Sequence, residues 1–119
     1  MPNPEVTLRT QTRADGSILV WQEAGLSGWP RATTERLLHW AADRPGSVWL
    51  AERDRNGGWH RVSYAQGATA VQAIGSALLD LGLSVDRPLL ILSGNSVAHA
   101  LLALGAQHVG IPSAALSPA

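Results

Sequence analysis

The sequence predicts an α/β fold with a β-hairpin, two or three helices and a β-α-β unit. Three observations predict it: an Asn-Gly turn between two strand-like segments, a long amphipathic segment with matched start and stop signals, and an apolar run followed by a turn and an apolar helix. These signals rest on turn conformation, helix capping and side-chain periodicity. The 119 residues suffice for one domain or part of one, and 45% apolar residues is typical of a packed chain.

The N-terminal stretch is predicted to be an extended arm and a loop. Residues 1–16 are mostly polar and close at the turn dipeptide Asp15-Gly16. Residues 17–22 (SILVWQ) are rich in β-forming side chains and are a candidate for a short strand. Glycines and a proline follow, which favour a loop up to residue 32.

A first helix is predicted from about Thr34 to Asp43. Thr33 or Thr34 can cap its N-terminus, because a hydroxyl oxygen accepts hydrogen bonds from the free backbone N–H groups there. Apolar side chains recur along one face of this segment, and Pro45-Gly46 is expected to end the helix.

Residues 47–53 and 59–63 are predicted to pair as an antiparallel hairpin. Asn56-Gly57 lies between them, and both residue types adopt the positive φ angles that tight hairpin turns need. The second strand then runs directly into the next helix.

The second helix has clear start and stop signals. Ser63 and Gln66 form a capping box, in which each side chain accepts a hydrogen bond from the backbone N–H of the other residue. Apolar residues recur at spacings of three and four, namely Ala68, Val71, Ile74, Leu78 and Leu81. Gly82 stands where a left-handed residue ends a helix, and Leu83 is expected to pack back on Leu78.

The last third of the chain predicts the β-α-β unit. Residues 89–92 are a continuous apolar run after a proline, which is typical of a parallel strand covered on both faces. Residues 93–96 form a turn, and a helix is expected from about Val97 to His108. Residues 110–112 then restart an extended segment.

The final helix indicates that this subdomain is incomplete. Residues 98–106 are apolar nearly all round, which is typical of a helix inside a larger protein. The other elements are too few to cover this helix together with both faces of residues 89–92. We therefore divide the chain into an arm and loop over residues 1–32 and an incomplete α/β subdomain over residues 33–119.

One turn is a candidate for binding a ligand. Gly94, Asn95 and Ser96 lie after a predicted parallel strand and before a helix, where open α/β sheets place ligands. Free N–H groups and the positive end of the helix dipole favour an anion there. The alternative is that Asn95 or Ser96 merely caps the helix.

Composition excludes several kinds of chemistry. Nine arginines balance nine acidic residues without forming a run, so we expect no nucleic-acid partner. The absence of lysine and cysteine excludes a phosphate-loop lysine, Schiff bases, disulfides and cysteine-bound zinc within these residues. The N-terminus does not resemble a signal peptide, and no apolar run is long enough for a membrane span. We expect a cytoplasmic protein without a membrane partner.

The remaining polar and aromatic residues are interpreted as structural, so we expect no catalytic residue and no metal site. His99 and His108 are nine residues apart on one predicted helix, so they point to opposite faces and cannot share a metal. Asp43, Asp80 and Asp86 fall at helix ends or in loops, where a solvated surface is expected. The five tryptophans lack regular spacing, and we expect them to pack in the core.

From residue 33 onward, a series of short motifs is specific in its order. The motifs are TERLLHWA at 34–41, RPG at 44–46, VSYA at 62–65, LGL at 81–83, LSGNS at 92–96, HALLAL at 99–104 and HVGIP at 108–112. In this order the sequence resembles the N-terminal part of the adenylate-forming (AMP-binding) acyl-CoA ligases. Among them it is most similar to the feruloyl-CoA synthetases.

The resemblance implies a two-step reaction for the parent protein, an acid–thiol ligase. A carboxylate, here aromatic, attacks the α-phosphate of ATP, and the thiol of coenzyme A then displaces AMP. The resemblance implies ATP, Mg²⁺ and coenzyme A for that parent, held by motifs that residues 1–119 do not contain. It implies that this chain is a scaffold segment, inactive alone and binding no cofactor alone, whose partner is the remainder of the ligase chain.

Two other interpretations stay open. The chain could be a stand-alone small α/β module that binds an anion or a nucleotide at the turn of residues 93–96. It could also be a fragment of an adenylating enzyme for fatty or amino acids. A stand-alone module should fold cooperatively as a monomer, whereas a fragment should expose apolar surface.

Overall fold

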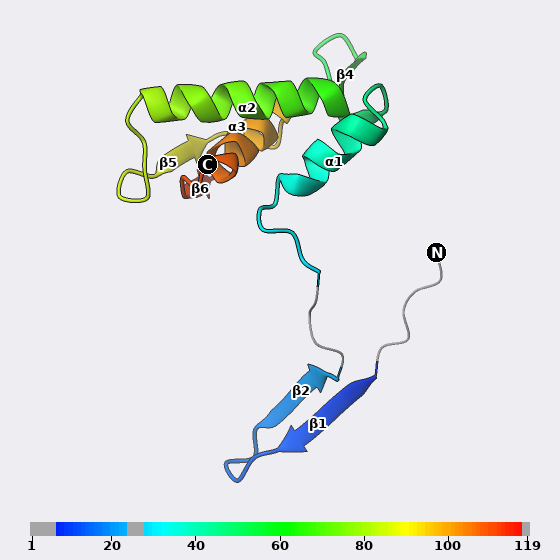
Figure 1. Ribbon diagram of the computed structural model, residues 1–119, viewed down its shortest axis with the longest axis vertical. Helices are drawn as coiled ribbons and strands as arrows, with labels where there is room; N and C mark the ends of the chain where they lie inside the picture. Colours follow the sequence, from blue (N-terminus) through cyan, green and yellow to red (C-terminus); the bar gives the residue numbers. More distant parts are fainter. Residues whose placement is uncertain (1–6, 24–27, 118–119) are drawn as a thin grey trace.

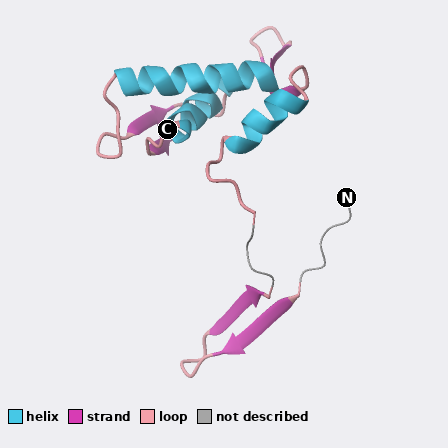
Figure 2. Ribbon diagram, in the orientation of Figure 1, coloured by secondary structure: helices cyan, strands magenta, loops and turns pink. Residues whose placement is uncertain are grey.

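The computed structural model describes residues 7–23 and 28–117, and it shows a mixed α/β arrangement (Figure 1). Three helices and three two-stranded sheets make up these residues (Figure 2). In chain order the elements are β1 (Leu8–Thr12), β2 (Ile18–Gln22), α1 (Glu35–Asp43), β3 (Val48–Arg53), β4 (Trp59–Ser63), α2 (Tyr64–Asp80), β5 (Leu89–Leu92), α3 (Val97–His108) and β6 (Ser113–Leu116).

The predicted arm contains a hairpin that the sequence did not reveal. Strands β1 and β2 pair antiparallel around the predicted Asp15-Gly16 turn, where Gly16 has φ +82°. Hydrogen bonds from the hydroxyl and the backbone N–H of Ser17 lower the pKa of the Asp15 carboxyl below 3.8. All ten residues of β1 and β2 are exposed, and the hairpin lies apart from the three helices (Figure 1).

Helix α1 lies where the sequence predicts a helix, but the predicted cap is wrong. Thr34 occupies the N-cap position without making a side-chain cap hydrogen bond. Its hydroxyl oxygen instead lies 2.9 Å from Nδ1 of His108, and the hydroxyl of Thr33 donates to Oε1 of Gln107 at 2.9 Å. Both threonines therefore join the start of α1 to the end of α3, because tertiary partners replace the local cap.

The β3–β4 hairpin confirms the predicted pairing. Gly57 in the turn has φ +81°, as the Asn-Gly signal requires. The Asp54 carboxylate accepts hydrogen bonds from the backbone N–H groups of Asn56 and Gly58, both at 2.8 Å. The turn is thus closed by local interactions that the sequence encodes.

Helix α2 confirms both of its predicted ends. The two hydrogen bonds of the Ser63–Gln66 capping box are present. Gly82 has φ +72°, and the backbone N–H of Leu83 donates to the carbonyl of Leu78 at 3.1 Å, as in a Schellman ending. Leu83 also packs against the buried cluster that contains Leu78.

Removing the cap should destabilise the whole fold through α2. We expect Ser63→Ala to lower the free energy of unfolding by about 0.5–2 kcal/mol, because an N-terminal N–H loses its acceptor. Urea titration followed by circular dichroism measures this change. Ser76→Ala, on the exposed face of the same helix, is the matched control. Equal midpoints for the two variants would contradict the capping role.

Helices α2 and α3 cross at two glycines. A Cβ atom on Gly75 would lie 3.2 Å from the carbonyl oxygen of Gly105 and 2.8 Å from Cγ1 of Val109. A Cβ atom on Gly105 would lie 2.8 Å from Cβ of Ile74. The close crossing therefore depends on the missing side chains of both glycines.

The core consists of two buried clusters along α2. One joins α1 to the first half of α2, through Leu37, Ala68 and Val71. The other joins the end of α2 to α3 and the segment before β6, through Leu78, Ala106 and Ile111. Helix α2 therefore connects the first helix to the β-α-β unit.

Strands β5 and β6 pair parallel, with α3 between them in sequence, as predicted for a β-α-β unit. The described residues cover β5 on one face only, in line with the expectation that the other elements are too few to cover both faces. Ile91 is buried at 5% exposure, whereas Leu90 and Leu92 are 62% and 67% exposed. Successive strand residues face opposite sides, so one face of the sheet packs inward and the other is open.

Candidate functional site

The turn after β5 lies at the carboxyl end of a parallel strand pair. Because β5 and β6 run parallel, with Leu92 opposite Leu116, the ends of both strands meet at one edge. A surface hollow of about 330 Å³ opens there. Its lining comes from Ser93, Gly94, Asn95 and His99 on one side and from Ala115, Leu116 and Ser117 on the other. Of the predicted ligand residues, Gly94 and Asn95 line this hollow and Ser96 does not.

One close polar contact lies in this hollow. The hydroxyl oxygen of Ser93 is 2.7 Å from Nδ1 of His99, and it is also 3.2 Å from the carbonyl oxygen of Gly94. The hydroxyl carries a single proton, so it donates either to the imidazole or to the carbonyl. The contact joins the end of β5 to the first turn of α3.

Two backbone donors at the N-terminus of α3 are already bound by the protein itself. Ser96 is the N-cap residue, and its side chain accepts a hydrogen bond from the N–H of His99 at 3.1 Å. Oε2 of Glu52, on strand β3, accepts one from the N–H of Val97 at 2.7 Å. The capping interpretation therefore holds for Ser96, and an internal carboxylate takes the position that an anion would favour.

A second hollow, of about 200 Å³, lies between β3 and α3. Its lining comes from Leu50, Ala51, Glu52, Asn95, Ser96, Val97 and Ala100. Asn95 lines this hollow and the one at the strand ends, so the turn separates the two. Sequence reasoning missed Glu52, because its contact with Val97 spans 45 residues and no local pattern marks it.

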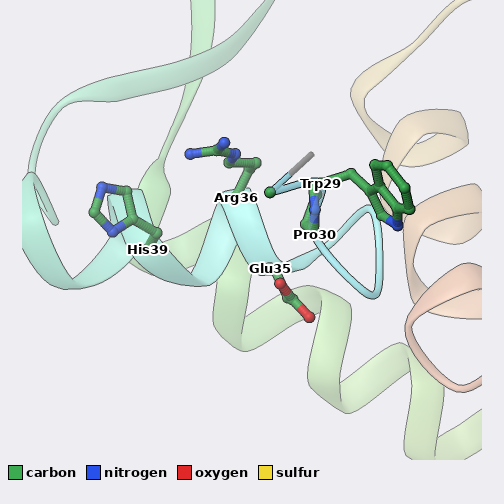
Figure 3. Close-up of a pocket in the computed structure, with 6 residues that line it drawn as sticks. Trp29, Pro30, Glu35, Arg36 and His39 are labelled. Carbon is green, nitrogen blue, oxygen red and sulfur yellow. The ribbon is translucent and has the colours of Figure 1, made fainter. Parts of the chain in front are cut away.

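A third hollow, of about 280 Å³, lies beside the start of α1 (Figure 3). Trp29, Glu35, Arg36 and His39 are among the residues that line it. In Figure 3 the side chain of Trp29 points to one side, and the side chains of Arg36 and His39 point to the other. They do not converge on a common point, so this arrangement does not define a binding site.

The two histidines of α3 have separate partners at opposite ends of the helix. His99 contacts Ser93, and His108 contacts Thr34. Within residues 7–23 and 28–117, no three His, Cys, Asp or Glu side chains come together as a metal site would require. The predicted surface carboxylates of Asp43, Asp80 and Asp86 are exposed.

The expectation that the tryptophans pack in the core is wrong for three of them. Trp21, Trp29 and Trp59 are 46%, 68% and 47% exposed. Trp49 packs against the cluster around Val71 and stacks near Tyr64, with ring centroids 6.2 Å apart. Trp59 instead lies beneath the Arg53 guanidinium, whose carbon is 4.5 Å from the ring centroid. These side chains lie on surfaces that the described residues leave open.

Comparison with known proteins defines the fold. No family model and no curated protein matches the chain. The crystal structure of IdnL1 matches 78% of this chain at 24% identity with a TM-score of 0.66, and the match covers 19% of IdnL1. The crystal structure of CmiS6 matches 79% at 25% identity with a TM-score of 0.60, and the match covers 25% of CmiS6. The chain therefore spans about a fifth to a quarter of these proteins and shares their local α/β fold.

The helices also bear on the expectation that no segment of the chain spans a membrane. In the part of the chain that the structure describes, no helix combines the length and the apolarity that crossing a bilayer requires.

Proposed function

We propose that this chain is an N-terminal scaffold segment of an ATP-dependent acyl-CoA ligase of the feruloyl-CoA synthetase type, inactive alone. The parent protein would convert a carboxylate, ATP and coenzyme A into an acyl-CoA, AMP and pyrophosphate. The observation that carries the proposal is the open apolar face of the β5–β6 sheet. Leu90, Leu92 and Leu116 on this face are 62%, 67% and 47% exposed.

A parallel sheet with a bare apolar face favours a scaffold over a free-standing module. Parallel strands are normally covered on both faces, because their connections place helices there. Here α3 lies against the face that carries Ile91, and the face of Leu90 and Leu92 has no cover among the described residues. IdnL1 and CmiS6 support this interpretation, because the matched part is a minor share of each of those chains.

The chemistry of the proposed reaction also favours a scaffold role. Charge that develops at phosphorus is stabilised by Mg²⁺ and by positioned cations. The chain has no lysine, and its described residues bring no set of metal-binding side chains together. The described residues do not fit a magnesium site, so we assign Mg²⁺, together with ATP and coenzyme A, to the remainder of the proposed ligase.

Segment exchange tests the proposal. Residues 33–117 replace the corresponding N-terminal segment of a feruloyl-CoA synthetase, and ATP–pyrophosphate exchange is measured with ferulate. We expect exchange from the chimera and none from the 119-residue chain alone. Fatty and amino acids as alternative substrates report on the other adenylating classes. A folded chimera without exchange, or turnover by the isolated chain, would contradict the proposal.

The open face itself can be tested within the same chimera. We expect Leu92→Glu to reduce exchange at least tenfold, because a charge on a docking face must be desolvated when the face is covered. Val85→Glu is the matched control, since Val85 is 70% exposed and lies outside the sheet. Equal activity of both variants would mean that this face is not covered in the ligase.

The hollow at the strand ends supports a second candidate function, a stand-alone module that binds an anion or a nucleotide. Gly94 and Asn95 line this hollow where open α/β sheets bind ligands. Calorimetric titration with AMP and with inorganic phosphate tests this function. Binding by a monomeric, cooperatively folding chain would favour the module over the scaffold.

A further inference from the structure

The carboxylate of Glu52 connects two parts of the molecule that lie far apart in sequence. Glu52 lies on β3, and its side chain is 35% exposed. Oε2 accepts a hydrogen bond at 2.7 Å from the N–H of Val97, the first residue of α3. Hydrogen bonds to a charged acceptor are short and about twice as strong as neutral ones. The hydrogen bond between Val97 and Glu52 is therefore of the stronger, charge-assisted kind.

Both ends of this connection have further interactions. On the hairpin side, Oε1 of Glu52 lies 3.4 Å from Nδ1 of His60, its opposite neighbour on β4. On the helix side, the N-terminus of α3 carries a partial positive charge that favours a carboxylate. The side chain of Ser96 accepts from the N–H of His99, so Glu52 and Ser96 together bind two of the free donors of this terminus.

We infer that Glu52 is a latch that couples the β3–β4 hairpin to the turn of residues 93–96. Val97 directly follows this turn, so fixing its N–H fixes the backbone where the turn enters the helix. Asn95 lines the hollow beside Glu52 and also the hollow at the strand ends. A displacement of β3 is thereby transmitted to the Ser93–His99 contact on the other side of the turn.

The latch goes beyond the proposed scaffold role, because it is a coupling of the β3–β4 hairpin to the turn of residues 93–96 through the side chain of Glu52. It does not depend on the identity of the ligase. Whatever packs against the hairpin would, through Glu52, change the shape of the hollow at the strand ends.

Nuclear magnetic resonance of the ¹⁵N-labelled 119-residue chain tests the latch. We expect Glu52→Ala to speed amide hydrogen exchange at Val97 by roughly tenfold or more, as loss of a charge-assisted hydrogen bond implies. It should also shift the imidazole signals of His99. The exchange rate of the Leu83 amide, which closes the Schellman ending of α2, should not change. Glu52→Gln retains an acceptor oxygen without the charge and should fall between alanine and the wild type.

Glu35→Gln is the matched control, since Glu35 is an exposed carboxylate at the start of α1 that accepts a hydrogen bond from Arg31. It should leave the Val97 and His99 signals unchanged. Wild-type exchange at Val97 in Glu52→Ala would overturn the inference. If Glu52→Ala speeds hydrogen exchange at every amide, Glu52→Gln is the deciding variant. In Glu52→Gln, a wild-type exchange rate at Val97 with unchanged His99 signals would overturn the latch. Faster exchange at Val97 alone would support it.

Discussion

Gly105→Leu is expected to disrupt the packing of α2 on α3 and to lower the free energy of unfolding by about 3 kcal/mol or more. A Cβ at this position already lies 2.8 Å from Cβ of Ile74, and a leucine adds three more carbons. The branched stem of Ile74 cannot rotate away, so the helices must separate. Stability of small domains is only about 5–15 kcal/mol, so the loss is a large fraction of the total.

Urea denaturation and hydrophobic-dye binding measure the effect of this substitution. Gly105→Ala should give a smaller loss, because the gain in helix propensity of about 1 kcal/mol offsets part of the clash. Ala98→Leu is the matched control, since Ala98 is exposed on the same helix. Equal stability of the Gly105→Leu and Ala98→Leu variants would show that the helices do not cross at the glycines.

Val71→Asp is expected to lower the free energy of unfolding by about 3–5 kcal/mol, the range for an uncompensated buried charge. Val71 is 0% exposed and lies in the apolar cluster with Leu37 and Ala68. A carboxylate there must lose its water without gaining a hydrogen bond. The substitution should therefore separate α1 from α2.

The pH dependence separates a buried charge from a simple loss of packing. Burial raises the pKa of the introduced carboxyl above its unfolded value of about 3.9. The folded state then binds more protons than the unfolded state, so the penalty is smallest below about pH 4 and grows as the pH rises. Gln72→Asp, at the exposed neighbouring position, should show neither effect. A pH-independent loss in Val71→Asp would contradict the burial of the introduced carboxyl.

Local patterns predicted most of the secondary structure. The capping box at Ser63, the left-handed Gly82 and the Asn56-Gly57 turn depend on interactions within a few residues, and all three are present. The parallel pairing of β5 with β6 followed from an apolar run, a turn and a helix. These features depend only on residues close together in the sequence, so local sequence patterns are sufficient to predict them.

The errors concern properties that depend on residues far apart in the sequence. Thr33 and Thr34 suited a helix cap, but their hydroxyls bind side chains at the end of α3 instead. The first hairpin was missed because β1 is polar and alternates weakly, so only pairing with β2 defines it. The exposed tryptophans were misplaced because apolar composition does not show which face of an element is covered.

The candidate site was predicted only in part. Its position at the end of β5 followed from sequence, because the strand, turn and helix are consecutive. The Ser93–His99 contact spans six residues and depends on the path of the turn. The Glu52 contact depends on how the hairpin packs, and nothing local to residues 93–96 indicates it.

By itself, the sequence determined the helices, the β3–β4 turn and the β-α-β order, because capping, φ preferences and apolar periodicity act over short distances. Only the tertiary structure decided which groups at the N-terminus of α3 are free, where the helices cross and which face of the β5–β6 sheet is open. These properties arise from contacts between distant residues, whose energies depend on packing geometry and on burial from water.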